Sequence, residues 1–452
     1  MRAVKVVLIF LAALTLTSCA NLQQTAEDLM RPPQLTRQQA ELFDALKNAL
    51  GVSTVKLKYP RAGSYRSAFV LYDLDGDEGE EALVFYDPET EEPSTKINIL
   101  DHSEESGWVS VYETTGEGVE IDRVDFKHLV SPDRWDILIG WSQSDSEEMA
   151  LQAYSYENGA LRAIGGKNSF SQVEMVDLNG DGLTEVILAG NSGSAKVPSV
   201  KLLGKTSEGF GQLSRSFLNE GIVSYSRIQL GDLDQGVRAV YVDASLSSGS
   251  AVTEVLAYSG GRLDRLYEEG EENKELFARF TRPLPIPSED VDGDQIVEIP
   301  CMEELPGYAD SYSAEREKQY LTRYIKPLDL LRLKPEEAPS AWTGLVSPES
   351  GFRFRFPEAW VGRVTVEKAQ ENSEWRFYAL PEQEEENAAL KELLRIRVYG
   401  QDEVQDKFET YEKVAKKGFH EYYVLIPRDE SIPEGMAVTL QQCRELLELI
   451  EQ

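Results

Sequence analysis

The chain has 452 residues, of which 41% are hydrophobic and 28% are charged, a balance typical of globular rather than disordered proteins. Its formal net charge of -33 argues against nucleic-acid binding, because phosphates are recognised by Lys and Arg. An acidic balance suits a solvated surface, or one that attracts divalent cations. The length allows two or three ordinary domains, or one large repeat domain and a smaller one.

Residues 1–18 have the pattern of a secretory signal peptide. Basic residues precede an apolar run at 6–14, which is too short to span a bilayer. The run ends at Leu16-Thr17-Ser18-Cys19, which resembles the lipobox of bacterial lipoproteins. The resemblance implies cleavage before Cys19 and its lipidation, so that the protein is anchored on the extracytoplasmic face of a bacterial membrane. Residues 19–34 would be a tether, and an ordinary secretory signal is the alternative.

A helix is expected within residues 35–51. Thr36 and Gln39 form a capping-box pattern, an apolar stripe follows, and Gly51 ends the helix. Beyond it the pattern changes to short strands and hairpins. Only Cys301 and Cys443 remain after the lipobox, so no disulfide framework is implied, and the sequence leaves open whether these two cysteines pair.

One acidic pattern of nine residues occurs three times, at 73–81, 177–185 and 290–298. Each copy places oxygen-bearing side chains at positions 1, 3, 5 and 9 and a glycine at position 4. This spacing lets a tight loop surround a hard cation. Solvated turns without metal are the alternative, because Asp, Asn and Gly favour turns by themselves. Three copies in one register favour structural calcium, whose binding free energy contributes to folding.

The acidic loops belong to a longer repeat. Each lies between two strand-like segments, and two further units show the same order of strands without the loop chemistry. The aspartates that anchor the five units are spaced by 52 to 58 residues: Asp73, Asp125, Asp177, Asp232 and Asp290. Four short strands at this period indicate a β-propeller of about five four-stranded blades, with a β-helix as the second choice.

The units at 52–335 resemble the FG-GAP or VCBS-type repeats of integrin-α-like β-propellers. That resemblance implies calcium bound by the loops, with backbone carbonyl ligands from Gly79, Leu183 and Ile296. It implies these side-chain ligands: Asp73, Asp75, Asp77, Glu81, Asp177, Asn179, Asp181, Glu185, Asp290, Asp292, Asp294 and Glu298. The unit anchored at Asp125 has lost the pattern. In the unit anchored at Asp232, Arg238 is expected to fill the cation's place with its own charge.

The repeated pattern of strands ends at residues 334–340, which have the composition of a linker. Residues 342–452 predict a small α+β or α/β domain with several strands and with helices at 402–416 and 439–451. The strand, Pro-x-x-Trp and second strand of residues 351–366 are similar to the opening of PsbP-like domains. This short resemblance implies a protein-contact role rather than a reaction.

We find no catalytic constellation in the sequence. Its three histidines, His102, His128 and His420, lack metal-type spacing, and no phosphate-binding Gly-rich loop is present. The sequence therefore predicts a non-catalytic, lipid-anchored binding or scaffold protein whose partner is a protein or a glycan. A secreted propeller enzyme acting on polysaccharide, and an envelope sensor or assembly factor, are the alternatives.

Overall fold

The structure is a computed structural model that divides the chain into two compact units. It describes residues 35–89, 93–143, 146–192, 196–234, 236–268, 270, 273–306, 318–369, 373–381, 390–400, 411–429 and 431–450. The first unit runs to residue 124 and includes 156–162, and the second holds 125–155 and the residues from 163 onward. The predicted signal peptide, tether and Cys19 lie outside the described residues. No helix in the described ranges is both long and apolar enough to cross a membrane.

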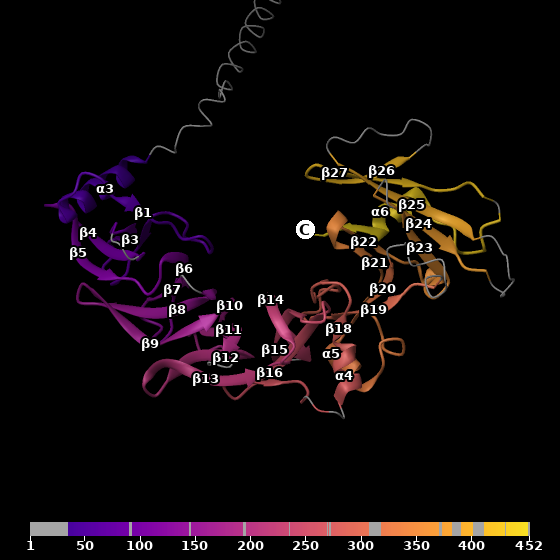
Figure 1. Ribbon diagram of the computed structural model, residues 1–452, viewed down its shortest axis with the longest axis horizontal. Coiled ribbons are helices and arrows are strands. Elements are labelled where there is room, and N and C mark those ends of the chain that lie inside the picture. Colours follow the sequence, from indigo (N-terminus) through magenta and orange to yellow (C-terminus); the bar gives the residue numbers. More distant parts are fainter. Residues whose placement is uncertain are drawn as a thin grey trace, which may run out of the picture. The chain divides into compact units, whose positions relative to one another are not determined.

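Antiparallel sheets of four or five strands make up most of the described chain, with few helices (Figure 1). The first sheet contains β1 (Lys56–Leu57), β2 (Phe69–Tyr72), β3 (Glu81–Asp87), β4 (Lys96–Ser103) and β5 (Gly107–Thr115). The second contains β6 (Glu120–Lys127), β7 (Asp136–Gln143), β8 (Ser146–Glu157) and β9 (Ala160–Phe170). The third contains β10 (Gln172–Val176), β11 (Glu185–Ser192), β12 (Val197–Thr206) and β13 (Gly209–Phe217). The fourth contains β14 (Ile222–Asp234), β15 (Val237–Leu246), β16 (Ala251–Ser259), β17 (Arg262–Arg265) and β18 (Thr281–Arg282).

Helix α3 (Arg37–Leu50) precedes the first sheet and packs on β4 and β5 (Figure 1). Its start follows the predicted capping box: the Thr36 hydroxyl accepts the Gln39 N–H, and the Gln39 side chain accepts the Thr36 N–H. Gly51 ends the helix in the left-handed region at φ 67°, a conformation that glycine adopts without steric cost. The apolar stripe buries Leu42 and Leu46 completely.

The inner strands are apolar runs because both of their faces are covered. The first six residues of β3 and of β7 are buried, and so are six consecutive residues of β15. In the second unit one cluster of buried side chains joins Ile187 of β11, Tyr241 of β15 and Ile299, each wholly buried. Burying one such side chain stabilises the fold by about 1.5–3 kcal/mol.

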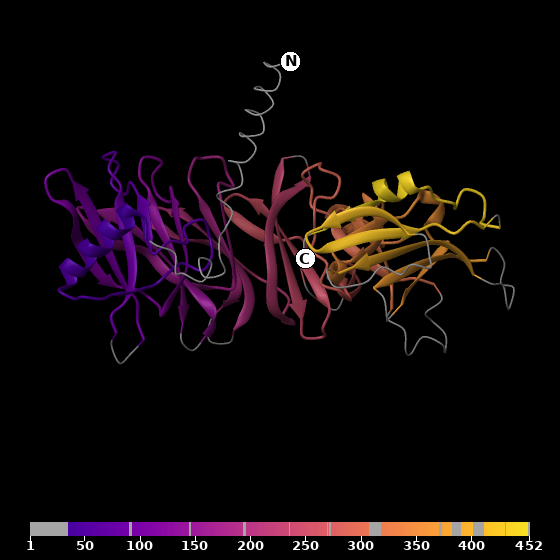
Figure 2. The ribbon, with the colours of Figure 1, turned by 90° about the horizontal axis from the view of Figure 1, so that it is seen from above.

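Two further sheets complete the second unit. The fifth contains β19 (Ile299–Glu304), β20 (Tyr320–Ile325), β21 (Trp342–Ser347), β22 (Phe352–Arg355) and β28 (Leu447–Leu449). The sixth contains β23 (Val364–Ala369), β24 (Glu374–Ala379), β25 (Lys391–Tyr399), β26 (Glu412–Lys417) and β27 (His420–Leu425). The short helices are α4 (Lys274–Arg279), α5 (Pro327–Arg332), α6 (Leu440–Leu446), η3 (Pro348–Ser350) and η4 (Glu358–Trp360). Helix α6, the yellow helix in Figure 2, packs against β26 and β28.

The fifth sheet differs from the repeat that the sequence predicts. Strands on the two sides of the expected linker pair with each other, Tyr324 of β20 opposite Trp342 of β21, and their rings meet edge to face at 5.8 Å. This contact between two large aromatic side chains favours one continuous sheet over a separate blade. The strand-like segment expected before the third acidic loop, at 280–287, forms only the two-residue strand β18, which pairs with β16 of the fourth sheet.

The helix predicted at 402–416 is wrong where the structure describes it. Residues 401–410 lie outside the described residues, but Glu412–Lys417 form strand β26, which pairs with β27. The predicted last helix begins with its capping box at Thr439 and Gln442, as expected, but ends at Leu446. It ends early because Leu447 and Leu449 pair with Phe354 and Phe352 of β22.

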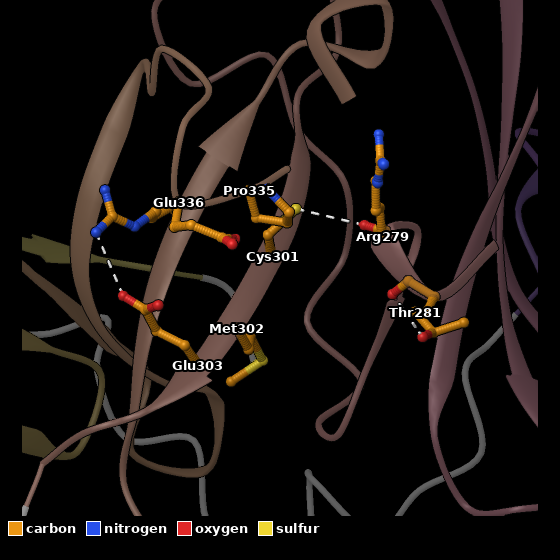
Figure 3. A pocket seen from close by; sticks show the side chains of 9 residues that line it. Arg279, Thr281, Cys301, Met302, Glu303, Pro335 and Glu336 are labelled. Carbon is orange, nitrogen blue, oxygen red and sulfur yellow. Dashed lines mark hydrogen bonds and ion pairs between the residues drawn. The ribbon is translucent and has the colours of Figure 1, made fainter. Parts of the chain in front are cut away.

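Cys301 and Cys443 are both free and buried. Cys301 lines a cavity of about 150 Å³ (Figure 3), where its thiol lies 3.4 Å from the carbonyl oxygen of Arg279. Burial raises the pKa of each thiol to about 12. Because the thiolate is the reactive form, both thiols should be inert in the folded protein.

We therefore expect a Cys19→Ser chain to react with Ellman's reagent at pH 8 at least about a hundredfold more slowly when folded than free cysteine does. Two thiols per chain should react once guanidinium unfolds the protein. The absorbance of the released thiolate measures both. Rapid stoichiometric labelling of the folded chain would contradict the burial of these side chains.

Candidate metal sites in three acidic loops

The three acidic loops have the same register. The first loop (Asp73–Glu81) joins β2 to β3, and Tyr72 pairs with Glu81. The second loop (Asp177–Glu185) joins β10 to β11, and Val176 pairs with Glu185. The third loop (Asp290–Glu298) is closed by a bridge between Glu289 and Glu298. In each case the residue before position 1 faces position 9, so the three loops close in the same register, the first two between paired strands and the third at an isolated bridge.

The aspartate at position 1 organises each turn. Its Oδ1 accepts the backbone N–H of the glycine at position 4, at 2.7 Å in all three loops: Asp73 from Gly76, Asp177 from Gly180, and Asp290 from Gly293. These glycines have φ values between 75° and 81°, which explains why position 4 is glycine. The N–H of position 7 donates to the carboxylate at position 5 in every loop: Gly79 to Asp77, Leu183 to Asp181, and Ile296 to Asp294.

The glutamate at position 9 is buried and closes each loop through a hydrogen bond. Glu81, Glu185 and Glu298 are the first residues after the loops' turns and are at most 3% exposed. In each, Oε2 accepts the backbone N–H of position 2, at 2.7, 2.8 and 3.0 Å respectively. The other oxygen of Glu298 is buried and has no hydrogen-bond partner. A buried carboxylate oxygen without a donor is a costly arrangement that a bound cation would relieve.

Carboxylate oxygens converge in the first and third loops. Oxygens of Asp73, Asp75 and Glu81 lie within 4.8 Å of one another, and so do those of Asp290, Asp292 and Asp294. Oxygen donors at this separation suit calcium, which takes six to eight oxygens at about 2.3–2.6 Å. The residues present therefore fit a hard divalent cation. The role of the position 7 carbonyls as ligands stays a prediction.

Electrostatics point the same way. Burial raises the pKa of Glu81 to about 7, and the neighbouring Asp75 adds to the shift. Burial and Asp292 do the same for Glu298, also to about 7. The pKa of Glu185 is raised for the same reasons, burial first and Asp181 next. Without a cation these loops confine like charges, which is unfavourable to the charged form.

The second loop is less acidic than the others because position 3 is Asn179. Its side-chain oxygen accepts the Asp181 N–H at 2.8 Å, and its amide donates to Oε1 of Glu185 at 3.2 Å. The structure thus brings Asp177, Asn179, Asp181 and Glu185 together, with the Asn179 amide hydrogen-bonded to the carboxylate of Glu185. A groove of about 590 Å³ beside this loop is lined by Asn179, Asp181, Glu185, Lys205, Arg238 and Tyr258 among others.

The turn between β6 and β7 keeps the same hydrogen bond and lacks the metal pattern. The anchor predicted at Asp125 is wrong, because Asp125 lies inside β6. Instead Asp136, the first residue of β7 and wholly buried, accepts the N–H of Leu129 at 3.3 Å. This is the same seven-residue interval that links position 9 to position 2 in the acidic loops. The guanidinium of Arg134 lies 3.0 Å from the other oxygen of Asp136 and supplies positive charge there.

Sequence reasoning missed Arg134 and Asp136 because it depended on the spacing of metal ligands, which the turn between β6 and β7 lacks. An acidic residue directly before a buried apolar strand was the available signal. At the anchor predicted at Asp232, Asp232 and Arg238 lie opposite each other across the turn between β14 and β15. Arg238 lies 3.7 Å from Asp232 and is 57% exposed, so this ion pair contributes little.

No protein-family model matches the chain, and no curated protein does either. Among solved structures, a rhamnogalacturonan lyase of Bacillus licheniformis aligns with 72% of this chain and 74% of its own, at 9% identity and a TM-score of 0.29. Sqt1 of Saccharomyces cerevisiae aligns with 82% of this chain and 98% of its own, at 10% identity and a TM-score of 0.30. A GH43 glycoside hydrolase aligns with 76% of this chain and 85% of its own, at 8% identity and a TM-score of 0.18. At these scores the likenesses carry no argument about function.

Proposed function

We propose that the protein is a lipid-anchored, non-catalytic binding or scaffold protein on the extracytoplasmic face of a bacterial membrane, whose strand-to-strand turns are stabilised by calcium. The observation that carries the calcium part is the shared hydrogen-bond pattern of the three acidic loops, together with the buried, unpartnered Oε1 of Glu298. Three loops with one register, one organising aspartate and one closing glutamate are more specific than a surface rich in acidic residues.

The anchoring part rests on the lipobox at Leu16-Thr17-Ser18-Cys19. Two or three acyl chains on Cys19 would hold the protein firmly, since one chain gives only marginal binding. Outside the cytoplasm calcium is available to the loops. The successive sheets are, in this proposal, blades of an FG-GAP or VCBS-type propeller, and the partner is a protein or a glycan.

Calcium binding tests the proposal most directly. In isothermal titration of the purified, chelator-treated chain, Asp73→Asn and Asp177→Asn should each remove one calcium site, because each deletes the aspartate that organises its loop. Asp133→Asn, which alters an exposed aspartate outside the acidic loops, is the matched control and should leave every site intact. A chain that takes up no calcium, or loop variants that bind as the parent does, would refute the metal assignment. Incorporation of labelled palmitate, lost in Cys19→Ala, tests the anchor separately.

A further inference from the structure

The third loop contains a cation supplied by the chain itself. The ammonium of Lys326 forms an ion pair with the Asp294 carboxylate at position 5. Lys326 follows β20 and is the N-cap residue of α5, so it reaches the loop from a different element, 32 residues further along the chain. Within the described ranges, no ion pair joins a lysine or arginine to a carboxylate of the first or second loop.

The ammonium acts on more than one carboxylate. The ammonium pairs with Asp294, and carboxylate oxygens of Asp290, Asp292 and Asp294 lie within 4.8 Å of one another. Lys326 therefore carries its charge beside the same oxygens that a divalent cation would bind. Two positive charges cannot share that position without strong repulsion.

Lys326 neutralises the loop only in part. The side chain is 31% exposed and pairs with Asp294, while Oε1 of Glu298 is buried and has no hydrogen-bond partner. An ammonium is a single charge on a flexible stem, whereas calcium gathers oxygens from several residues at once. The pairing of Lys326 with Asp294 thus leaves the buried Oε1 of Glu298 without a partner.

The turn between β6 and β7 also pairs a loop carboxylate with a cation supplied by the chain itself. There Arg134 neutralises the buried Asp136, and the loop has no metal pattern left. In its charge balance the third loop is intermediate. It has one lysine partner for several carboxylates, whereas Arg134 pairs with the single carboxylate of Asp136, and in the described residues the first two loops have no lysine or arginine partner.

We propose that the third loop is an exchange site in which Lys326 and a divalent cation compete for Asp294, so that this loop binds calcium more weakly than the first two and keeps its turn without metal. The inference rests on the proposed calcium binding and adds Lys326 as the residue that sets the affinity of one loop. Its consequence is graded loading: the first and second loops fill at low calcium, and the third fills only at higher concentrations.

Isothermal titration of the full chain with calcium chloride after chelator treatment tests this. The parent chain should show two tight sites and a third that is about tenfold or more weaker, because calcium must displace a paired charge. Lys326→Met should tighten the weakest site about tenfold and leave the other two unchanged. Lys326→Arg, which keeps the charge, should retain the weak site. Lys318→Met is the matched control, because Lys318 pairs with Glu304 outside the loops.

A second readout does not depend on bound metal. In chelator, Lys326→Met should lower the thermal midpoint of the chain, because Asp294 loses its paired counter-charge, and calcium should then raise that midpoint more than in the parent. Asp292→Asn should delete the weakest site alone, which assigns it to the third loop. Three equally tight sites in the parent, or an unchanged third site in Lys326→Met, would overturn this inference and leave the calcium proposal standing. An absence of calcium binding by any loop would overturn both.

Discussion

Replacing Arg282 with methionine should lower the free energy of unfolding of the second unit by about 3–5 kcal/mol, because it leaves a buried carboxylate without its counter-charge. The side chains of Arg282 and Asp243 are 1% and 3% exposed, and they lie 2.8 Å apart. The Thr253 hydroxyl bonds to both of them. The other Asp243 oxygen accepts the N–H and the hydroxyl of Ser288, each at 3.0 Å. Every polar atom removed from this network strands a partner away from water.

Urea denaturation followed by far-ultraviolet circular dichroism measures the loss. Arg262→Met is the matched control: Arg262 pairs with Asp264 at 3.2 Å, but both side chains are more than half exposed, so the change should stay within about 1 kcal/mol. The double variant Arg282→Met with Asp243→Asn should recover part of the loss, since the stranded charge is gone. A loss below about 1 kcal/mol for Arg282→Met would show that the buried pair is not what fixes this region.

Calcium at a hundred times its dissociation constant should raise the free energy of unfolding by about 2.7 kcal/mol for each loop that it fills, provided that the unfolded chain does not bind it. The physical reason is the confinement of like charges around the buried Glu81, Glu185 and Glu298. Urea midpoints measured in calcium and in chelator give the difference. Magnesium should be a poor substitute, since it demands near-octahedral geometry and dehydrates reluctantly.

Variants of single loops show which loop contributes to the calcium-dependent gain in the free energy of unfolding. Asp73→Asn should reduce the calcium-dependent gain in the first unit, and Asp177→Asn should reduce it in the second, because the two loops belong to different compact units. Asp133→Asn should keep the whole gain. Identical midpoints in calcium and chelator would contradict a stabilising role for the metal, whatever the binding stoichiometry.

Much of the local structure could be predicted from short-range pattern. The capping box of α3 and the first and second loops with their flanking strands depend on residues within nine positions of one another, and such interactions leave a readable spacing. The anchor predicted at Asp125 is wrong because the corresponding turn does not have that readable spacing. The turn between β6 and β7 preserves the hydrogen bond of Asp136 but not the spacing of ligands, so the sequence pattern placed the anchor inside β6.

Long-range pairing could not be predicted. Nothing local to 280–287 indicates that Thr281–Arg282 pair with β16, or that Trp342 lies opposite Tyr324. Segment 412–417 carries a pattern that suits a helix as well as an exposed edge strand, and its partner β27 decides the outcome. Lys326 belongs to this class as well. It reaches the third loop from 32 residues away, so no motif placed it there.

The pairing of β22 with β28 has a consequence for the order in which the protein is made. Arg353 of β22 bonds to Glu448 of β28 at 2.6 Å across 95 residues of sequence, and its other arm bonds to Glu289 just before the third loop at 3.0 Å. During synthesis, β22 therefore leaves the ribosome long before its partner strand exists. Until residues 447–449 follow, the fifth sheet presents an unpaired edge, which invites pairing with other chains. Because this pairing joins residues 95 apart in the sequence, we expect it to form after the local hairpins of the sheets.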